Sequence, residues 1–293
     1  MTRSTPSYLL VSHGSRDPRS QAMVERLAQL VQQRLSWLAI AQQAYSAPLQ
    51  PALTTKTASA FSSLEQGFSQ QFTASIVTAT RSQAIESAPI PVVETACLEL
   101  GSATLQTQIC QFAQKTRAAG KTEMRIVPLF LLQGVHVTED VPAEVEAARL
   151  QLTNFCRLTL CSHLGNHPGL FHLLNEKMGK AASQAFLLVA HGSRRAGGNK
   201  QVEAIARQLN ATVAYWSTPP SLEDQVIELM QQGHQRITIL PYFLFAGSLT
   251  DAIMRRTEEL AERFPKVAFR LMPPLGATRE LAGLVADLSQ QSV

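Results

Sequence analysis

The chain of 293 residues is long enough for two domains of ordinary size, each able to bury its own core. Hydrophobic residues make up 45% and charged residues 16%, a composition typical of globular proteins. A formal net charge of +4 without any run of Lys or Arg argues against a nucleic-acid partner and suits an acidic small molecule.

The start of the chain does not resemble a signal peptide, because the apolar stretch 8–11 is short and is interrupted by His13. No window reaches about 18 apolar residues, so we expect no membrane-spanning segment and no membrane partner. The cysteines show neither the CxxC spacing of metal and redox sites nor a secreted disulfide framework: Cys97, Cys110, Cys156 and Cys161. We therefore expect a reduced protein located in the cytoplasm.

The chain repeats itself. Three segments occur twice in the same order: YLLVSHGSR at 8–16 and FLLVAHGSR at 186–194, IVPLFLLQG at 126–134 and ILPYFLFAG at 239–247, and Leu164-Gly165 and Leu275-Gly276, each before a helical stretch. Ordered matches of this kind indicate an internal duplication. We predict an N-terminal domain of residues 1–180 and a C-terminal domain of residues 181–293.

The predicted elements alternate between strands and helices. In the first half we expect strands before His13, ending in 96–99, within 126–134 and between Cys156 and Cys161, then a helical stretch after Leu164-Gly165. In the second half we expect strands at 185–190, 212–216, 236–245 and 267–272 and helices at 199–209, 221–230, 251–264 and 279–288. The sequence therefore predicts an α/β fold of two similar domains, each a four-stranded parallel sheet with helices on both faces.

The first half carries an insertion that the second half lacks. The distance from His13 to Glu99 is 86 positions, whereas the distance from His191 to Ser217 is 26. The extra residues lie at about 37–91 and are rich in Ala, Ser, Thr and Gln. They form either a mobile flap over the site or a tolerated surface insertion. We favour the insertion, because long additions to loops cost little free energy.

Three polar side chains follow the ends of predicted strands in the first half. His13 follows the first strand, Glu99 ends the second, and His136 follows the third. Ligands bind beyond the carboxyl ends of the strands in open parallel sheets, so these side chains are expected to meet at one rim. Two imidazoles and a carboxylate can hold a divalent first-row metal and leave coordination positions open. The alternatives are a histidine that satisfies a tight turn, a carboxylate paired with a base, and a surface histidine.

The repeat supplies an internal comparison for this candidate site. Alignment of the halves places His191 opposite His13, Ser217 opposite Glu99 and Leu249 opposite His136. The second half has thus kept one of the three polar groups. We predict one active site in the first half and a degenerate copy in the second.

Two further polar clusters occur in the sequence. Basic side chains after the two HGS turns are natural carboxylate receptors, and we select as substrate contacts Ser15, Arg16, His191 and Arg194, with Arg19 and Arg195 nearby. The alternative for the arginines is a solvated first turn of a helix. A second group is expected to be structural because its spacing fits no zinc template: Cys156, Cys161, His163, His167 and His172.

These motifs together resemble a known family. The HGSR turn after an apolar strand, the Cys97-Leu98-Glu99-Leu100 element, and a third segment that reads PLFL, then GVH, then DVP resemble the sirohydrochlorin chelatases, the CbiX/SirB group of class II chelatases. The resemblance covers nearly the whole chain except 37–91, and its two-half layout is similar to the long members. It implies ATP-independent insertion of a divalent metal into sirohydrochlorin, in sirohaem or cobalamin biosynthesis.

The resemblance also assigns roles. His13 and His136 would bind the metal and accept protons, and Glu99 would assist them. No cofactor is implied beyond the substrate metal ion, for which Fe²⁺ is favoured and Co²⁺ comes next. The expected partner is a small-molecule tetrapyrrole, and the expected oligomeric state is a monomer with pseudo-dimeric halves.

Two other functions use the same motifs. A histidine phosphohydrolase places its histidine in a His-Gly turn, but such sites usually carry an arginine before the histidine, and Ser12 and Ala190 stand there. A non-enzymatic tetrapyrrole or metal carrier would use the same cleft. We favour the chelatase.

Overall fold

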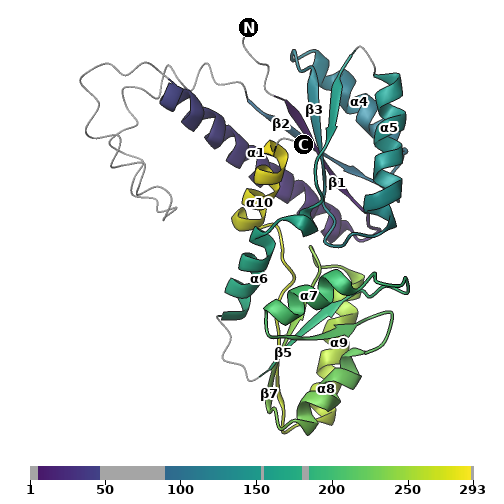
Figure 1. The fold of residues 1–293 in the computed structure, drawn as a ribbon, viewed down its shortest axis with the longest axis vertical. Coiled ribbons are helices and arrows are strands. Elements are labelled where there is room, and N and C mark those ends of the chain that lie inside the picture. Colours follow the sequence, from purple (N-terminus) through teal and green to yellow (C-terminus); the bar gives the residue numbers. More distant parts are fainter. Residues whose placement is uncertain (1–5, 47–89, 153–154, 180–184, 292–293) are drawn as a thin grey trace, which may run out of the picture.

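The computed structural model describes residues 6–46, 90–152, 155–179 and 185–291. It contains two four-stranded sheets, parallel throughout, with strand orders β2-β1-β3-β4 and β6-β5-β7-β8. The second order is the first repeated, and helices cover both faces of each sheet (Figure 1). The predicted fold class, a duplicated α/β architecture, is confirmed.

The elements follow the predicted order in both halves. The N-terminal half contains β1 (Ser7–Ser12), α1 (Pro18–Ser46), β2 (Val92–Cys97), α4 (Leu105–Arg117), β3 (Glu123–Pro128), the π-helical turn η2 (His136–Asp140), α5 (Val141–Gln151), β4 (Arg157–Leu160), the 3-10 turn η3 (Leu164–Asn166) and α6 (Gly169–Gly179). The C-terminal half contains β5 (Ala185–Ala190), α7 (Lys200–Gln208), β6 (Thr212–Tyr215), α8 (Leu222–Gln231), β7 (Arg236–Pro241), α9 (Ser248–Arg263), β8 (Ala268–Leu271) and α10 (Arg279–Gln290).

The apolar runs become central strands because both of their faces are buried. In β1, Leu9 and Val11 join the core that α4 and α5 cover, whereas Tyr8 and Leu10 join the core that α1 and α10 cover. Helix starts follow local chemistry as well. Ser221 caps α8 and forms a capping box with Asp224, so the predicted start of this helix is confirmed.

The third strand of each half, β3 or β7, ends before the apolar segment that predicted it. The strand predicted at 236–245 ends at Pro241, because its neighbour β5 ends at Ala190 and pairing stops there. Tyr242 still donates its N–H to Val189 O, and the chain then leaves the sheet. In the first half, β3 likewise ends at Pro128. The apolar residues after both strands therefore form loops beyond the carboxyl ends of the sheets.

The two halves exchange their last helices. The helix α10 packs on α1 and β3 of the N-terminal half, where Arg125 donates to Ser289 O at 2.6 Å and Gln290 donates to the Tyr8 hydroxyl at 2.7 Å. Figure 1 shows α6 descending beside the C-terminal half, and Lys177 donates to Pro274 O at 3.1 Å. One buried cluster therefore runs through both halves.

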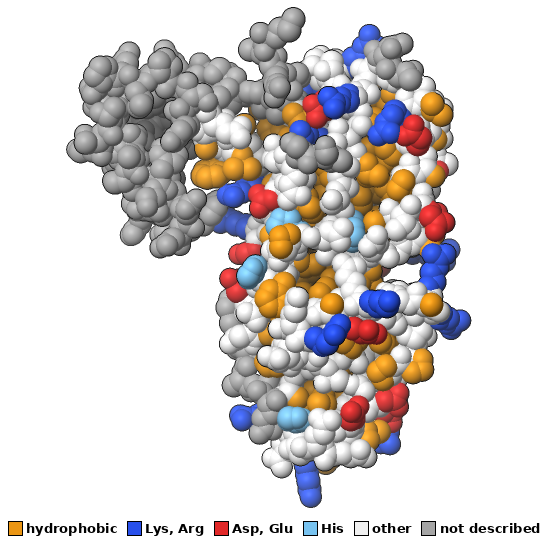
Figure 2. Space-filling view, in the orientation of Figure 1, with side chains coloured by type: hydrophobic (Ala, Val, Ile, Leu, Met, Phe, Trp, Pro, Cys, Tyr) orange, Lys and Arg blue, Asp and Glu red, His pale blue; other side chains and the backbone are white. Residues whose placement is uncertain are grey.

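The predicted insertion falls mostly outside the described residues. Residues 37–46 continue α1, and residues 47–89 are not described, so both interpretations of this segment stay predictions. Within the described residues, no helix is long and apolar enough to cross a bilayer. On the face shown in Figure 2, described basic and acidic side chains are interspersed, so any attraction of an acidic partner there is local.

The shared core makes a prediction about stability. Leu281 of α10 is fully buried in the cluster that joins the halves, so Leu281→Ala should lower the free energy of unfolding by about 2–5 kcal/mol. Both halves should still unfold in one transition, as measured by denaturant titration. The control is Leu150→Ala, at a side chain 70% exposed, which should change stability little. Two separate transitions in the wild-type protein would contradict a shared core.

Candidate active site

The turn after β1 brings His13 next to Glu99. Beyond the ends of the two strands, Leu98 donates its N–H to Ser12 O and Glu99 donates its N–H to His13 O, both at 2.9 Å. Gly14 has a φ of +99°, and a Cβ there would lie 2.0 Å from Glu99 O. Only glycine fits this approach. The HGS turn therefore places His13 and Glu99 on the same rim of the sheet.

His136 reaches the same rim from the third strand. It is the first residue of η2, at the end of the loop that follows β3. Its ring lies edge-on to the ring of His13, with centroids 4.7 Å apart. His13 Nε2 is 3.8 Å from Glu99 Oε2, and one ligand atom from each of the three residues lies within 4.8 Å of the others. The structure thus brings together the three residues selected from the sequence.

The spacing and exposure of these side chains suit capture of a metal ion. Metal–ligand bonds of about 2.0–2.2 Å place the ligands of a tetrahedral site about 3.4 Å apart, so small side-chain rotations would close the trio on an ion. The side chains of His13 and Glu99 are 48% and 52% exposed. The site is therefore open on one side, where an ion and a further ligand can approach.

Asp140 orients His136, and the sequence reasoning gave it no role. Its Oδ2 lies 2.8 Å from His136 Nδ1, one turn further along the same element. A carboxylate at Nδ1 fixes the tautomer and direction of the ring and leaves Nε2 for a metal. The signal was present in the sequence as an acid four residues after a histidine, but that spacing becomes a contact only if the segment is helical.

The C-terminal half repeats the backbone of this site without its ligands. Ser217 donates its N–H to His191 O at 2.9 Å, as Glu99 does to His13 O, so the predicted equivalence of Ser217 and Glu99 is confirmed. The Ser217 hydroxyl also donates to His191 O at 2.8 Å. Among the described residues, the group of potential metal ligands formed by His13, Glu99 and His136 has no counterpart around His191.

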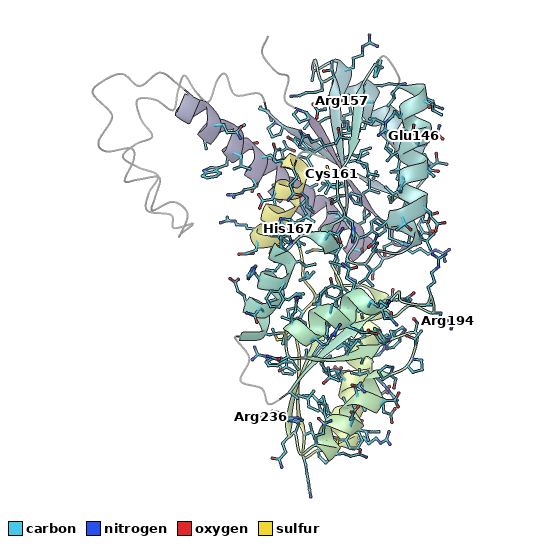
Figure 3. The ribbon with its side chains drawn as sticks, viewed as in Figure 1. Glu146, Arg157, Cys161, His167, Arg194 and Arg236 are labelled. Atoms are coloured by element: carbon cyan, nitrogen blue, oxygen red, sulfur yellow. The ribbon has the colours of Figure 1, made fainter. Side chains whose placement is uncertain are left out.

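The predicted substrate-contact residues lie in the loops after the two histidines. Ser15 accepts a hydrogen bond from the Asp17 N–H at 3.1 Å, and Arg16 beside it is exposed. Arg194 is exposed in the equivalent loop after β5, at the level where the halves meet (Figure 3). Arg195 lies 3.8 Å from Glu139 of η2 and so connects the halves.

Arg19 has a different environment from Arg16. Its guanidinium contacts the carboxylates of Asp17 and Asp251, each at 2.6 Å, and these hydrogen bonds raise its pKa. Asp251 belongs to α9, so this ion pair also joins the halves. Of the four arginines selected from the sequence, Arg19 is already bound by carboxylates of the protein.

The cysteine–histidine cluster does not converge on a point. Cys161 is buried beside β4, and burial raises the pKa of its thiol to about 11. Burial also lowers the pKa of the buried His163 imidazole. His167 Nδ1 accepts a hydrogen bond from the Gly169 N–H at 3.0 Å, near α10 (Figure 3). Among the described residues, these side chains form no group that could hold a metal ion.

In a comparison with known families, the model of the CbiX family matches two segments of the chain. It matches residues 63–181 and again residues 185–292, and both β1 and His13 precede the first match. The chain is 24% identical over 185 residues to a sirohydrochlorin ferrochelatase of Priestia megaterium, covering 59% of this chain and 68% of that protein. It is 20% identical over 218 residues to a sirohydrochlorin cobaltochelatase of the same organism, covering 69% and 70%.

A plant protein and two solved structures extend these similarities. The chloroplastic sirohydrochlorin ferrochelatase of Arabidopsis thaliana is 27% identical over 160 residues, covering 51% of this chain and 68% of that protein. SirB from Bacillus subtilis with Fe³⁺ has a TM-score of 0.64 at 18% identity, covering 97% of this chain and 94% of that one. A CbiX described as the terminal enzyme of sirohaem biosynthesis in denitrifying bacteria has a TM-score of 0.52 at 19% identity, covering 98% and 100%. These structures share the fold.

The contact between Asp140 and His136 predicts an effect on metal affinity. Asp140→Asn removes the charge at His136 Nδ1, and a lost partner of this kind typically weakens metal binding by about 10–100-fold. Titration of the protein with Co²⁺, followed by visible absorbance, measures the change. Glu146→Gln, an exposed acid in the following helix, is the control and should bind as the wild type does. An unchanged affinity in Asp140→Asn would show that the carboxylate does not orient the ring.

Proposed function

Because the chain belongs to the CbiX family, we propose that it is a metal chelatase that inserts a divalent metal ion into sirohydrochlorin without ATP. The observation that carries the proposal is the trio His13, Glu99 and His136, whose ligand atoms lie within 4.8 Å of one another on an open rim. Ferrochelatases and a cobaltochelatase among the relatives support the choice of substrate. Hydrolysis of a nucleotide is not needed in this scheme, because the metal–nitrogen bonds of the product drive the exchange.

Insertion of the metal requires two events at the same place. The metal ion has to lose part of its water shell, and two pyrrole N–H groups of the macrocycle have to lose their protons. Neutral imidazoles serve both needs, since they bind first-row metals and accept protons near neutral pH. His13 and His136 would hold the ion through their ring nitrogens, and Glu99 would balance its charge.

The sequence of transfers is balanced in charge and atoms. The divalent ion passes from the imidazoles to the four macrocycle nitrogens, and the two pyrrole protons pass to the imidazoles as these are vacated. The protons then leave to solvent, to which the side chains of His13 and Glu99 are exposed. Asp140 keeps its place at His136 Nδ1 throughout, so that Nε2 carries both the ion and the proton in turn.

The macrocycle would lie between the halves. The two rims face each other, because Arg195 after β5 approaches Glu139 after β3, and the Tyr242 hydroxyl donates to Leu131 O at 3.4 Å. Sirohydrochlorin carries many carboxylates on its edge. We assign their recognition to Ser15 and Arg16 on one rim and to His191 and Arg194 on the other.

The identity of the metal and the state of the protein complete the proposal. We favour Fe²⁺, with Co²⁺ second, because sirohaem synthesis needs only this step after the macrocycle is made, and the ferrochelatases among the relatives support that choice. We propose that the protein acts in the cytoplasm as a monomer. The fused halves already supply both rims of the cleft, as two subunits would in a dimer.

The class of reaction can be tested directly. Anaerobic incubation of the protein with sirohydrochlorin and Fe²⁺, Co²⁺ or Ni²⁺, without nucleotide, should convert the visible spectrum to that of the metallated product. Multiple turnovers above the uncatalysed rate are expected, fastest with Fe²⁺. Binding of the tetrapyrrole without conversion would identify a carrier instead of an enzyme.

The asymmetry of the halves predicts unequal effects of matched substitutions. His13→Ala and His136→Ala should each lower the rate of insertion by about 100-fold or more, since each removes a ligand and proton acceptor. His191→Ala should lower it by about 10-fold or less, the size of a supporting contact. Steady-state rates at saturating metal decide this, with His234→Ala before β7, at the opposite end of the second sheet, as the control. Equal and severe losses at His13 and His191 would contradict a single site.

A further inference from the structure

The C-terminal half contacts the segment that carries His136 at several points. The Tyr242 hydroxyl donates to Leu131 O, and the Gln133 N–H donates to Gln201 Oε1 at 3.0 Å. Arg195 approaches Glu139 three residues beyond His136. His136 is thus bracketed by contacts from the other half, whereas its own imidazole contacts His13, Phe130 and Asp140 of the N-terminal half.

Gln201 makes the most specific of these contacts. It belongs to α7 and is half-buried, and its amide uses both of its functions. The oxygen accepts from the Gln133 N–H, and the nitrogen donates to Gly165 O at 3.1 Å. A primary amide offers a donor and an acceptor in one planar group, which few other side chains can do.

The two backbone groups that Gln201 joins lie in loops that already touch. Gly165 donates its N–H to Phe130 O at 2.8 Å, and a Cβ at Gly165 would lie 2.1 Å from Leu131 O. The loop after β3 is therefore held by the loop after β4 on one side and by Gln201 on the other. Gln201 binds this loop at Gln133, which is three residues before His136.

The repeat shows that the contact belongs to one half only. The helices α1 and α7 align without a gap, because Val24 and Ala28 are buried as Val202 and Ala206 are. In this alignment Met23 stands opposite Gln201. A thioether cannot make two hydrogen bonds to backbone groups. The half that lacks a counterpart of His136 thus supplies the amide, and the half that has His136 receives it.

We propose that Gln201 is a positioning residue for His136, through which the C-terminal half fixes one metal ligand of the N-terminal half. The proposal rests on the proposed function, because it takes His136 as a metal ligand. His13 is fixed by its own strand and turn, whereas His136 follows a loop of several residues. A looser loop would widen the range of distances between the two imidazoles. Binding of the ion would then cost free energy, because it would have to order the two rings.

The experiment compares full-length variants substituted in α7, with His136→Ala as the reference for loss of the metal ligand itself. Gln201→Met keeps the length of the side chain, introduces the residue of the other repeat and removes both hydrogen bonds. Gln201→Glu keeps the acceptor for the Gln133 N–H and removes the donor to Gly165 O. Gln208→Met is the matched control at an exposed position of the same helix. Each protein is titrated with Co²⁺ in the absence of tetrapyrrole and assayed for insertion.

The expected results separate a positioning role from a general loss of structure. Gln201→Met should weaken Co²⁺ binding by about 10-fold, the lower end for a group that acts through a metal ligand, and raise the KM for metal similarly. The KM for sirohydrochlorin and the melting temperature should stay near the wild-type values. Gln201→Glu should fall between Gln201→Met and the wild type, and Gln208→Met should match the wild type.

Three outcomes would overturn the proposal, and the measurements distinguish them. Wild-type Co²⁺ affinity and metal KM in Gln201→Met would show that the amide does not position His136. Equal rises in the KM for metal and for sirohydrochlorin, with a lowered melting temperature, would show a structural role only. If wild type and His136→Ala bind Co²⁺ equally, the metal site itself is misassigned, and the proposed function fails together with this inference.

Discussion

The close approach of the turn after β1 to the end of β2 is the constraint on which the site depends. The backbone of His13 and Glu99 pairs beyond the last residues of the strands, and Gly14 leaves no room for a side chain against Glu99 O. Since β1 lies between β2 and β3 in the sheet, the ends of all three strands reach one rim. The imidazoles and the carboxylate meet there because each follows the end of one of these strands, His136 after the loop that leaves β3.

Comparison of the two halves shows that the backbone geometry of the site does not depend on its polar side chains. The second half keeps the strand order, the glycine turn at Gly192 and the hydrogen bond from the Ser217 N–H to His191 O. It lacks the carboxylate and the second imidazole, and Leu249 stands where the latter would be. The backbone geometry is thus independent of the potential ligands, so that one half holds the complete trio while the other keeps the same turn without it.

The two halves are joined because the last helix of each, α6 or α10, packs against the other half. The exchange of α6 and α10 draws both sheets into one buried cluster. Polar contacts also join the two halves, including the ion pair between Arg19 and Asp251. In the function that we propose, a planar macrocycle between the rims would meet basic side chains at its edge, and the N-terminal half alone would present the metal ion.

Much of this arrangement can be predicted from local patterns in the sequence. The repeated HGS segments determined the duplication, and the alternation of strands and helices determined the parallel sheets. The positions of His13, Glu99 and His136 after successive strands were enough to predict that they meet. Each of these inferences needs only the direction and order of neighbouring elements, which parallel sheets constrain strongly.

Other features were decided only by the tertiary structure. Periodicity shows that α10 has an apolar face, but not that this face covers the sheet of the other half. The ion pair of Arg19 with Asp251 and the bridge made by Gln201 depend on the packing of segments that are far apart in the sequence. The hydrogen bond between His136 and Asp140 depends on the helical conformation of the segment that carries both residues. Contacts between side chains of different halves are determined by the whole fold, because the packing of every intervening helix and strand sets the distance between the two side chains.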